Sequence, residues 1–208
     1  MPFPRQGSDL PPASAPRQAL TNGAKIRVAA TALALVALIF AAFWTARPRH
    51  AASLVGGAFA LQATSGGVLT DADMKGKPFL VFFGYTHCPD ICPTTLAQIS
   101  AVLQKLGDKP IAALFITFDP ERDTLASLKD YLGSFDPRIV GLTGDARAVE
   151  QAVKAYRVYA KKVPLADGDY TMDHTSLVYF MDADGGFIEA LDLERKAEDV
   201  AKEIAGYL

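Results

Sequence analysis

Two unbroken apolar runs indicate the centre of a buried parallel sheet. Phe79–Tyr85 and Ile111–Phe118 lack the apolar-polar alternation of a half-exposed strand, so both are expected to be covered on two faces. Between them, Pro93–Leu106 carries leucine, isoleucine and valine at three- and four-residue spacing, which predicts a helix with one buried face. Strand, helix and strand at this length form a right-handed parallel unit.

The segments around this unit continue the alternation of strands and helices. Phe59–Gln62 and Gly67–Thr70 predict a small hairpin before it. After it, Thr124–Leu132 and Asp145–Tyr156 predict helices, and Ile139–Leu142 predicts a short strand between them.

The end of the domain changes to antiparallel pairing. Ser176–Met181 and Phe187–Leu191 flank the turn Asp182–Gly186, which predicts a hairpin, and Arg195–Leu208 predicts a last helix. A parallel unit followed by such a hairpin and a helix is the element order of the thioredoxin fold. We therefore predict an α/β, thioredoxin-like domain over residues 59–208, with an N-terminal hairpin.

The N-terminal part has a different pattern. Residues 1–25 are rich in Pro, Ala and Ser without an apolar period, which predicts a disordered cytoplasmic tail. Val28–Thr45 then carries no charge over about 27 Å of helix, enough to cross a bilayer once. We predict a transmembrane anchor at 26–45 and a linker at 46–58. A cleaved signal peptide is the alternative, and in either case the remaining domain is exported.

The overall composition narrows the class of protein. The chain has 208 residues, half of them hydrophobic, and a formal net charge of −2. This composition fits one folded domain with a tail, and it offers no basic surplus for a phosphate backbone. Nucleic acid is therefore not an expected partner.

The two cysteines of the chain, Cys88 and Cys92, lie four residues apart after the first buried strand. Backbone N–H groups at the carboxyl edge of a parallel sheet and the start of a helix favour thiolates there, but the charge of Asp90 between the cysteines opposes them, so we expect no net shift of the thiol pKa. Pro89 and Pro93 disfavour a regular helix, so we expect both cysteines on a loop. The spacing allows a disulfide or two ligands of a soft metal, and it does not decide between them.

A histidine is a candidate third ligand. His87 is the weaker candidate, since neighbouring side chains on an extended chain point apart. His174 precedes the strand that should run close to the cysteine loop. Two thiolates and one imidazole suit Cu(I) and, in another geometry, Cu(II), whereas zinc would want a fourth ligand. The competing interpretation is that His174 only orders the loop before its strand.

Other polar residues near these positions have structural interpretations. In Asp119–Thr124, Asp123 or Thr124 is a normal N-cap and Pro120 a normal turn residue. Met172 and Met181 are expected to pack in the core rather than bind metal.

Four segments, taken together, resemble the Sco/SenC family. They are GYTHCPDICPTTL (Gly84–Leu96), FDPERDT (Phe118–Thr124), GLTGD (Gly141–Asp145) and DHTSLVYFMDADGGF (Asp173–Phe187). Their order and spacing match over about 150 residues, and the combination of CPxxCP with a downstream DH-S is specific.

The resemblance implies a copper site formed by Cys88, Cys92 and His174, a single-pass anchor, and a role in building the dinuclear copper (CuA) centre of cytochrome c oxidase. The same two cysteines are expected to form a redox disulfide. Expected partners are the copper-accepting oxidase subunit, another copper chaperone as donor, and the inner (cytoplasmic) membrane, with the domain in the periplasm.

The alternative function is a thiol-disulfide oxidoreductase that reduces the copper-binding cysteines of the oxidase. Such enzymes generally use C-x2-C and a cis-proline that faces it, whereas this chain has C-x3-C and no proline after Pro164. Asp173 and His174 stand where that proline would be. A thiol peroxidase would need a cation beside the thiolate, and Arg122 is its one candidate. We therefore expect a metallochaperone rather than an enzyme.

Overall fold

The computed structural model describes residues 35, 36, 38, 54–166 and 168–208. The predicted tail (1–25), the anchor (26–45, apart from three residues) and most of the linker (46–58) lie outside the described residues. Among the residues that are described, no helix has both the length and the apolar composition that a membrane crossing requires.

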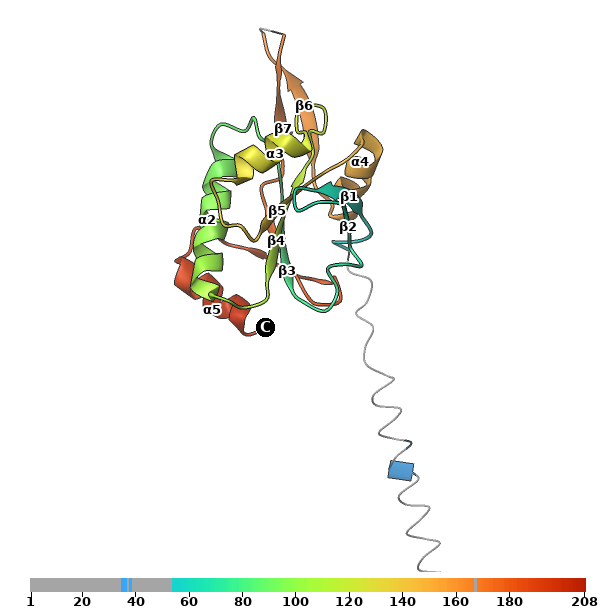
Figure 1. Ribbon diagram of the computed structural model, residues 1–208, viewed down its shortest axis with the longest axis vertical. Helices are drawn as coiled ribbons and strands as arrows, with labels where there is room; N and C mark the ends of the chain where they lie inside the picture. Colours follow the sequence, from blue (N-terminus) through green and yellow to red (C-terminus); the bar gives the residue numbers. More distant parts are fainter. Residues whose placement is uncertain (1–34, 37, 39–53, 167) are drawn as a thin grey trace, which may run out of the picture. The chain divides into compact units, whose positions relative to one another are not determined.

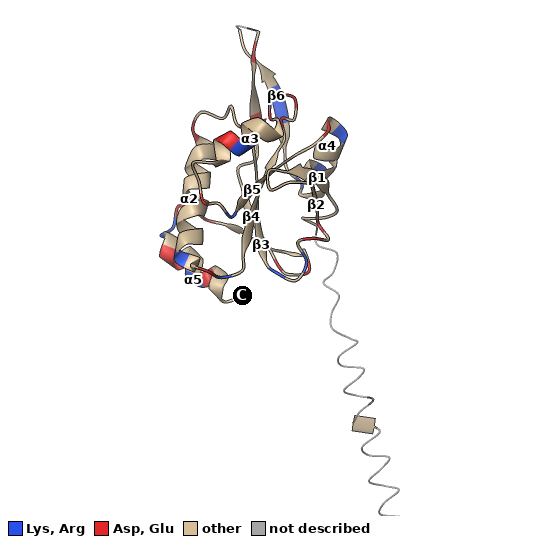
Figure 2. Ribbon diagram, in the orientation of Figure 1, with Lys and Arg blue, Asp and Glu red and all other residues tan. Residues whose placement is uncertain are grey.

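A seven-stranded sheet in the order β2-β1-β5-β4-β3-β8-β9 forms the centre of the domain (Figure 1). Its middle strands β3 (Phe79–Gly84), β4 (Ala112–Thr117) and β5 (Ile139–Thr143) are parallel. Every residue of β3 is buried, as its unbroken apolar run predicts. Figure 2 shows these strands without charged residues, while charged residues appear on helices, on connecting loops and on other strands.

Antiparallel strands extend the sheet on both sides. On one side, β1 (Ala60–Ala63) pairs with β5 and with β2 (Val68–Thr70), so the predicted N-terminal hairpin is confirmed. On the other side, β8 (Val178–Met181) pairs with β3 and with β9 (Phe187–Leu191), as predicted for the late hairpin.

Helices cover both faces of the sheet. On one face, α2 (Ile91–Leu106) packs against α5 (Ala197–Ala205), and α3 (Leu125–Leu132) packs on β5. On the other face, α4 (Ala146–Ala155) contacts β1. Burying the leucine, isoleucine and phenylalanine side chains between these layers contributes roughly 1.5 to 3 kcal/mol for each one that is fully buried. The predicted α/β, thioredoxin-like arrangement is thereby confirmed in outline.

A second, two-stranded sheet was not predicted. Strands β6 (Ala160–Pro164) and β7 (Tyr170–His174) form an antiparallel hairpin that projects from the domain (Figure 1). Its sequence is polar, and four of the five residues of β6 are exposed, so it lacks the apolar alternation that predicts a strand. His174 is the last residue of β7, whereas the sequence placed it in a loop.

Candidate metal centre

The two cysteines lie where β3 gives way to α2. Cys88 is in the connecting loop, and Cys92 is the second residue of the helix that begins at Ile91. The prediction that both lie on a loop is therefore wrong for Cys92. The first N–H groups of a helix have no intrahelical acceptor, so Pro93, which lacks this group, fits in the first turn without loss of a hydrogen bond.

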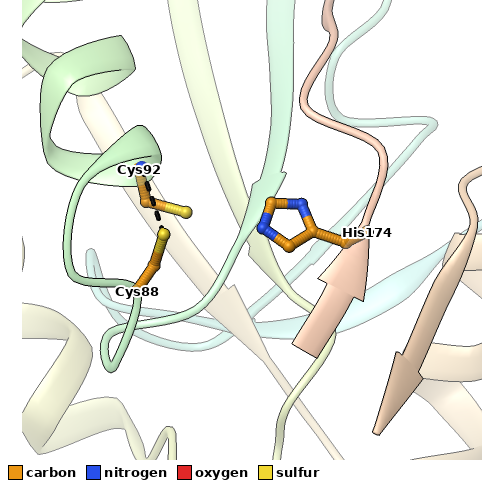
Figure 3. A group of neighbouring side chains, drawn as sticks. All are labelled: Cys88, Cys92 and His174. Carbon is orange, nitrogen blue, oxygen red and sulfur yellow. Dashed lines mark hydrogen bonds between the residues drawn. The ribbon is translucent and has the colours of Figure 1, made fainter. Parts of the chain in front are cut away.

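The two sulfur atoms face each other across this turn. The backbone N–H of Cys92 donates a hydrogen bond of 3.4 Å to Cys88 Sγ (Figure 3). Both cysteines are free thiols in the structure; 9% of Cys88 is exposed and none of Cys92. Burial raises the pKa of the Cys92 thiol well above its usual range, because a thiolate would lose its hydration there.

His174 joins the two cysteines from the other side. One ligand atom from each of the three residues lies within 4.8 Å of the other two, although His174 is 82 residues after Cys92 in the chain. Figure 3 shows one nitrogen of the imidazole ring pointing toward the sulfur pair. The predicted third candidate is thus brought to the cysteines by the β6–β7 hairpin.

The surroundings of His174 fix the ring and its tautomer. Nδ1 lies 3.0 Å from the backbone oxygen of Thr175. A carbonyl oxygen only accepts, so Nδ1 carries the proton and Nε2 keeps a free lone pair for a metal. The ring also packs against Phe118, with centroids 4.7 Å apart, and edge-on against Tyr85 at 5.8 Å.

The other candidates do not join this group. His87 is exposed, and its Nδ1 lies 3.1 Å from Thr86 Oγ1. Met172 and Met181 are buried in the hydrophobic core, which confirms their packing role. Thr124 caps α3 by accepting a hydrogen bond from the Ser127 N–H, as expected of this segment.

Asp123 supports the cysteine loop, a role that sequence reasoning missed. Its carboxylate is fully buried and accepts hydrogen bonds from the Thr86 hydroxyl at 2.6 Å and from the Thr86 backbone N–H. It also accepts one of 2.6 Å from the Thr117 hydroxyl at the end of β4. Asp123 therefore ties the residue two before Cys88 to the sheet. The sequence signal was an acidic residue after a parallel strand, at the same sheet edge as the cysteines.

Gly84 permits the close approach of Cys92 to the sheet. A Cβ atom at this position would lie 2.6 Å from Phe115 Cε2 and 2.9 Å from Cys92 Sγ. Any side chain at position 84 would therefore clash with both the aromatic ring and the sulfur atom.

This donor set favours a soft, low-coordinate metal ion. Two thiolates and one imidazole match the preference of Cu(I) for sulfur and nitrogen ligands. A structural zinc ion takes four ligands, and no fourth His, Cys, Asp or Glu of the described residues belongs to the group.

Comparison with known proteins places this geometry in a family. Residues 47–208 match the family model described as SCO1/SenC. The human protein named "Protein SCO1 homolog, mitochondrial" is 38% identical over 168 residues, which cover 78% of this chain and 56% of the human protein. The chain thus spans little more than half the length of that relative.

Solved structures agree with this assignment. The structure of Bradyrhizobium japonicum ScoI with copper bound is 52% identical, covers 74% of this chain and 99% of that one, and superposes with a TM-score of 0.72. Yeast Sco1 with copper bound is 38% identical, covers 74% of this chain and 87% of that one, and gives a TM-score of 0.67. The chain described here belongs to the SCO1/SenC family.

Proposed function

We propose that this chain is a copper metallochaperone that helps to assemble the dinuclear copper (CuA) centre of cytochrome c oxidase. Cys88, Cys92 and His174 hold one copper ion and pass it to the copper-accepting oxidase subunit by ligand exchange. The observation that carries the proposal is the meeting of the three ligand atoms within 4.8 Å. Two related structures that contain copper support the choice of metal.

The proposal includes the location of the protein. Residues 26–45 form a single-pass anchor in the inner membrane, with the domain on the periplasmic side, and residues 46–58 link the two. Another copper chaperone supplies the ion. The uncharged run Val28–Thr45, flanked by more basic residues before it than after it, supports this orientation.

The ligand set is tested by X-ray absorption on the full chain, purified in detergent and loaded anaerobically with Cu(I). We expect two sulfur neighbours and one nitrogen neighbour for each copper ion. In His174→Ala the nitrogen neighbour should be lost, and the affinity for Cu(I) should fall on the order of tenfold or more, because about 1.4 kcal/mol of binding energy corresponds to tenfold.

His87→Ala is the matched control, since it removes an exposed imidazole one residue from Cys88. It should leave both the spectrum and the affinity unchanged. An affinity that is the same in His174→Ala as in the parent chain would remove His174 from the site.

A second function, thiol-disulfide exchange, is favoured by the different exposure of the two cysteines. The Cys88 thiolate would attack a partner disulfide, and Cys92 would then displace the partner's second thiol, leaving a Cys88–Cys92 disulfide and two reduced partner thiols. Cys88 is the more exposed sulfur and accepts the N–H of Cys92. Insulin-reduction activity comparable to that of a dedicated reductase would favour this function.

A further inference from the structure

The hairpin that carries His174 is fastened to the domain by a cluster of three side chains, here called the clasp: Asp119, Arg122 and Tyr170. Asp119 and Arg122 lie in the loop after β4, and Tyr170 is the first residue of β7. The Asp119 carboxylate accepts a hydrogen bond of 2.6 Å from Arg122 Nε and one of 2.8 Å from the Tyr170 hydroxyl. One buried carboxylate therefore links the loop and the hairpin.

Arg122 also binds the hairpin directly. Its guanidinium carbon lies 3.7 Å from the centre of the Tyr170 ring, and Nη1 donates a hydrogen bond of 3.0 Å to the Tyr170 backbone oxygen. The Asp119 side chain is fully buried, and 17% of the Arg122 side chain is exposed. Stacking on an aromatic ring and pairing with a carboxylate are both stronger when they are shielded from water.

One polar atom of the clasp is unpaired. Within the described part of the chain, Arg122 Nη2 is buried and has no hydrogen-bond partner. An unpaired buried donor on a charged group is unfavourable, and such defects are retained mainly where function requires them. This points to a role for Arg122 beyond folding.

The position of the clasp supplies that role. Tyr170 and His174 are four residues apart on one strand, so their side chains project from the same face about 13 Å apart. The β6–β7 hairpin pairs with no strand of the main sheet among the described residues. Between these two residues, β7 also contacts the domain through the Tyr85–Thr171 hydrogen bond of 3.0 Å and the buried Met172. The clasp at one end of β7 therefore contributes to how firmly the ligand at the other end is held.

We propose that Arg122, Tyr170 and Asp119 are positioning residues for His174. When their contacts are formed, they hold the imidazole against the sulfur pair. When these contacts break, the imidazole can leave while the two cysteines keep the copper ion. This rests on the proposed copper site. It assigns to the clasp the step in which the third ligand is exchanged for a ligand of the acceptor.

The first test is a double-mutant cycle between Tyr170→Leu and His174→Ala in the full chain, with Cu(I) affinity measured by competition with a chromophoric chelator. Tyr170→Leu should weaken Cu(I) binding about tenfold in the parent chain. It should have no effect in the His174→Ala background. The difference between the two backgrounds is the coupling energy, and this size is within the range found for residues of one network. Equal losses in both backgrounds, or no loss in the parent chain, would overturn the proposal.

Two variants serve as controls. Tyr170→Phe keeps the ring stacked on Arg122 but removes the hydroxyl that donates to Asp119, so it should lose less affinity than Tyr170→Leu. Lys161→Ala removes an exposed lysine of β6 that lies opposite Asp173 in the hairpin, on the other face from Tyr170 and His174. It should leave the affinity unchanged, because the clasp remains intact.

A readout without copper separates this proposal from the metal site itself. In the metal-free protein, amide hydrogen exchange in β6 and β7 should rise about tenfold in Tyr170→Leu, while exchange in α2 stays the same. Unchanged exchange in the hairpin would overturn the clasp, whatever the chain binds. Failure of the proposed function would appear instead as a parent chain that does not bind Cu(I).

Discussion

Asp123 illustrates how one buried carboxylate can prepare a metal site that it does not join. It takes hydrogen bonds from Thr86 and Thr117, which fix the start of the cysteine loop relative to the sheet. A carboxylate removed from water is stable only when it accepts hydrogen bonds from the protein, so the groups that donate to it are held in place with it. The position of Cys88 is thus determined from two strands.

The different burial of the two cysteines predicts different reactivity. Each cysteine can be labelled separately with iodoacetamide, Cys92 in the variant Cys88→Ser and Cys88 in the variant Cys92→Ser. At neutral pH we expect Cys92 to react on the order of tenfold more slowly than Cys88, since the thiolate is the reactive form. Burial raises the pKa of the Cys92 thiol. Its labelling rate should therefore continue to rise at pH values above about 8.5, where an ordinary thiol is already ionised.

The raised pKa also has a sign for stability. As pH rises, the Cys92 thiol ionises in the unfolded chain before it ionises in the folded one. The contribution of the neutral, buried thiol to the free energy of unfolding is therefore complete below the unfolded pKa and is lost as pH rises toward the folded pKa. Equal labelling rates for the two variants, with the same pH dependence, would contradict the buried state of Cys92.

At the scale of elements, the end of β3 controls the distance between sheet and metal site. Gly84→Ala would place a methyl group against Phe115 and Cys92 Sγ. We expect a loss of about 1 to 3 kcal/mol in the free energy of unfolding from overpacking, together with weaker Cu(I) binding. Chemical denaturation and chelator competition measure the two effects.

Gly141→Ala is the matched control for this prediction. Its added methyl group would lie 2.7 Å from Leu132 Cδ1, so a similar loss of stability is expected in β5, away from the sulfur atoms. Copper affinity should be unchanged. Equal losses of affinity in both variants would show that general destabilisation, and not the position of Cys92, weakens the site.

The elements that could be predicted from sequence are those whose apolar pattern reports burial. The strands β3 and β4 and the helix α2 follow directly from two apolar runs and one helical period, because their side chains fill the core. The hairpin β6–β7 could not be predicted in this way. It is held by Tyr170 and Arg122, a contact between residues 48 positions apart that no local pattern records.

The three candidate ligands and their meeting could be proposed from the sequence, but the contacts that bring them together could not. Cys88 and Cys92 were identified by their spacing, and His174 by its place before a late strand. The approach of the imidazole depends on the hairpin, and the supporting role of Asp123 depends on the folded loop. Both are tertiary contacts, so only the structure supplies them.

At the scale of the whole molecule, a metal held by residues from both halves of the chain couples binding to stability. Free Cu(I) at a thousand times its dissociation constant should add about 4 kcal/mol to the free energy of unfolding, provided that the unfolded chain binds it weakly. For a domain of this size that should raise Tm by about 8 to 16 °C.

Differential scanning calorimetry with and without anaerobic Cu(I) measures this shift. His174→Ala should show a smaller rise, because the unfolded chain with its two nearby cysteines then competes better with the folded one. A rise of the same size in both proteins would mean that the late half of the chain contributes nothing to binding.

The full burial of Cys92 makes the site one-sided. Its sulfur atom lies close to Gly84 at the end of β3, so the sheet shields a bound ion from that side. In the proposed function, a recipient protein approaches past Cys88 and His174, and the bond to Cys92 is then the last to break. The burial of one ligand would then determine the order in which the metal–ligand bonds are exchanged in the proposed delivery, whichever molecule accepts the ion.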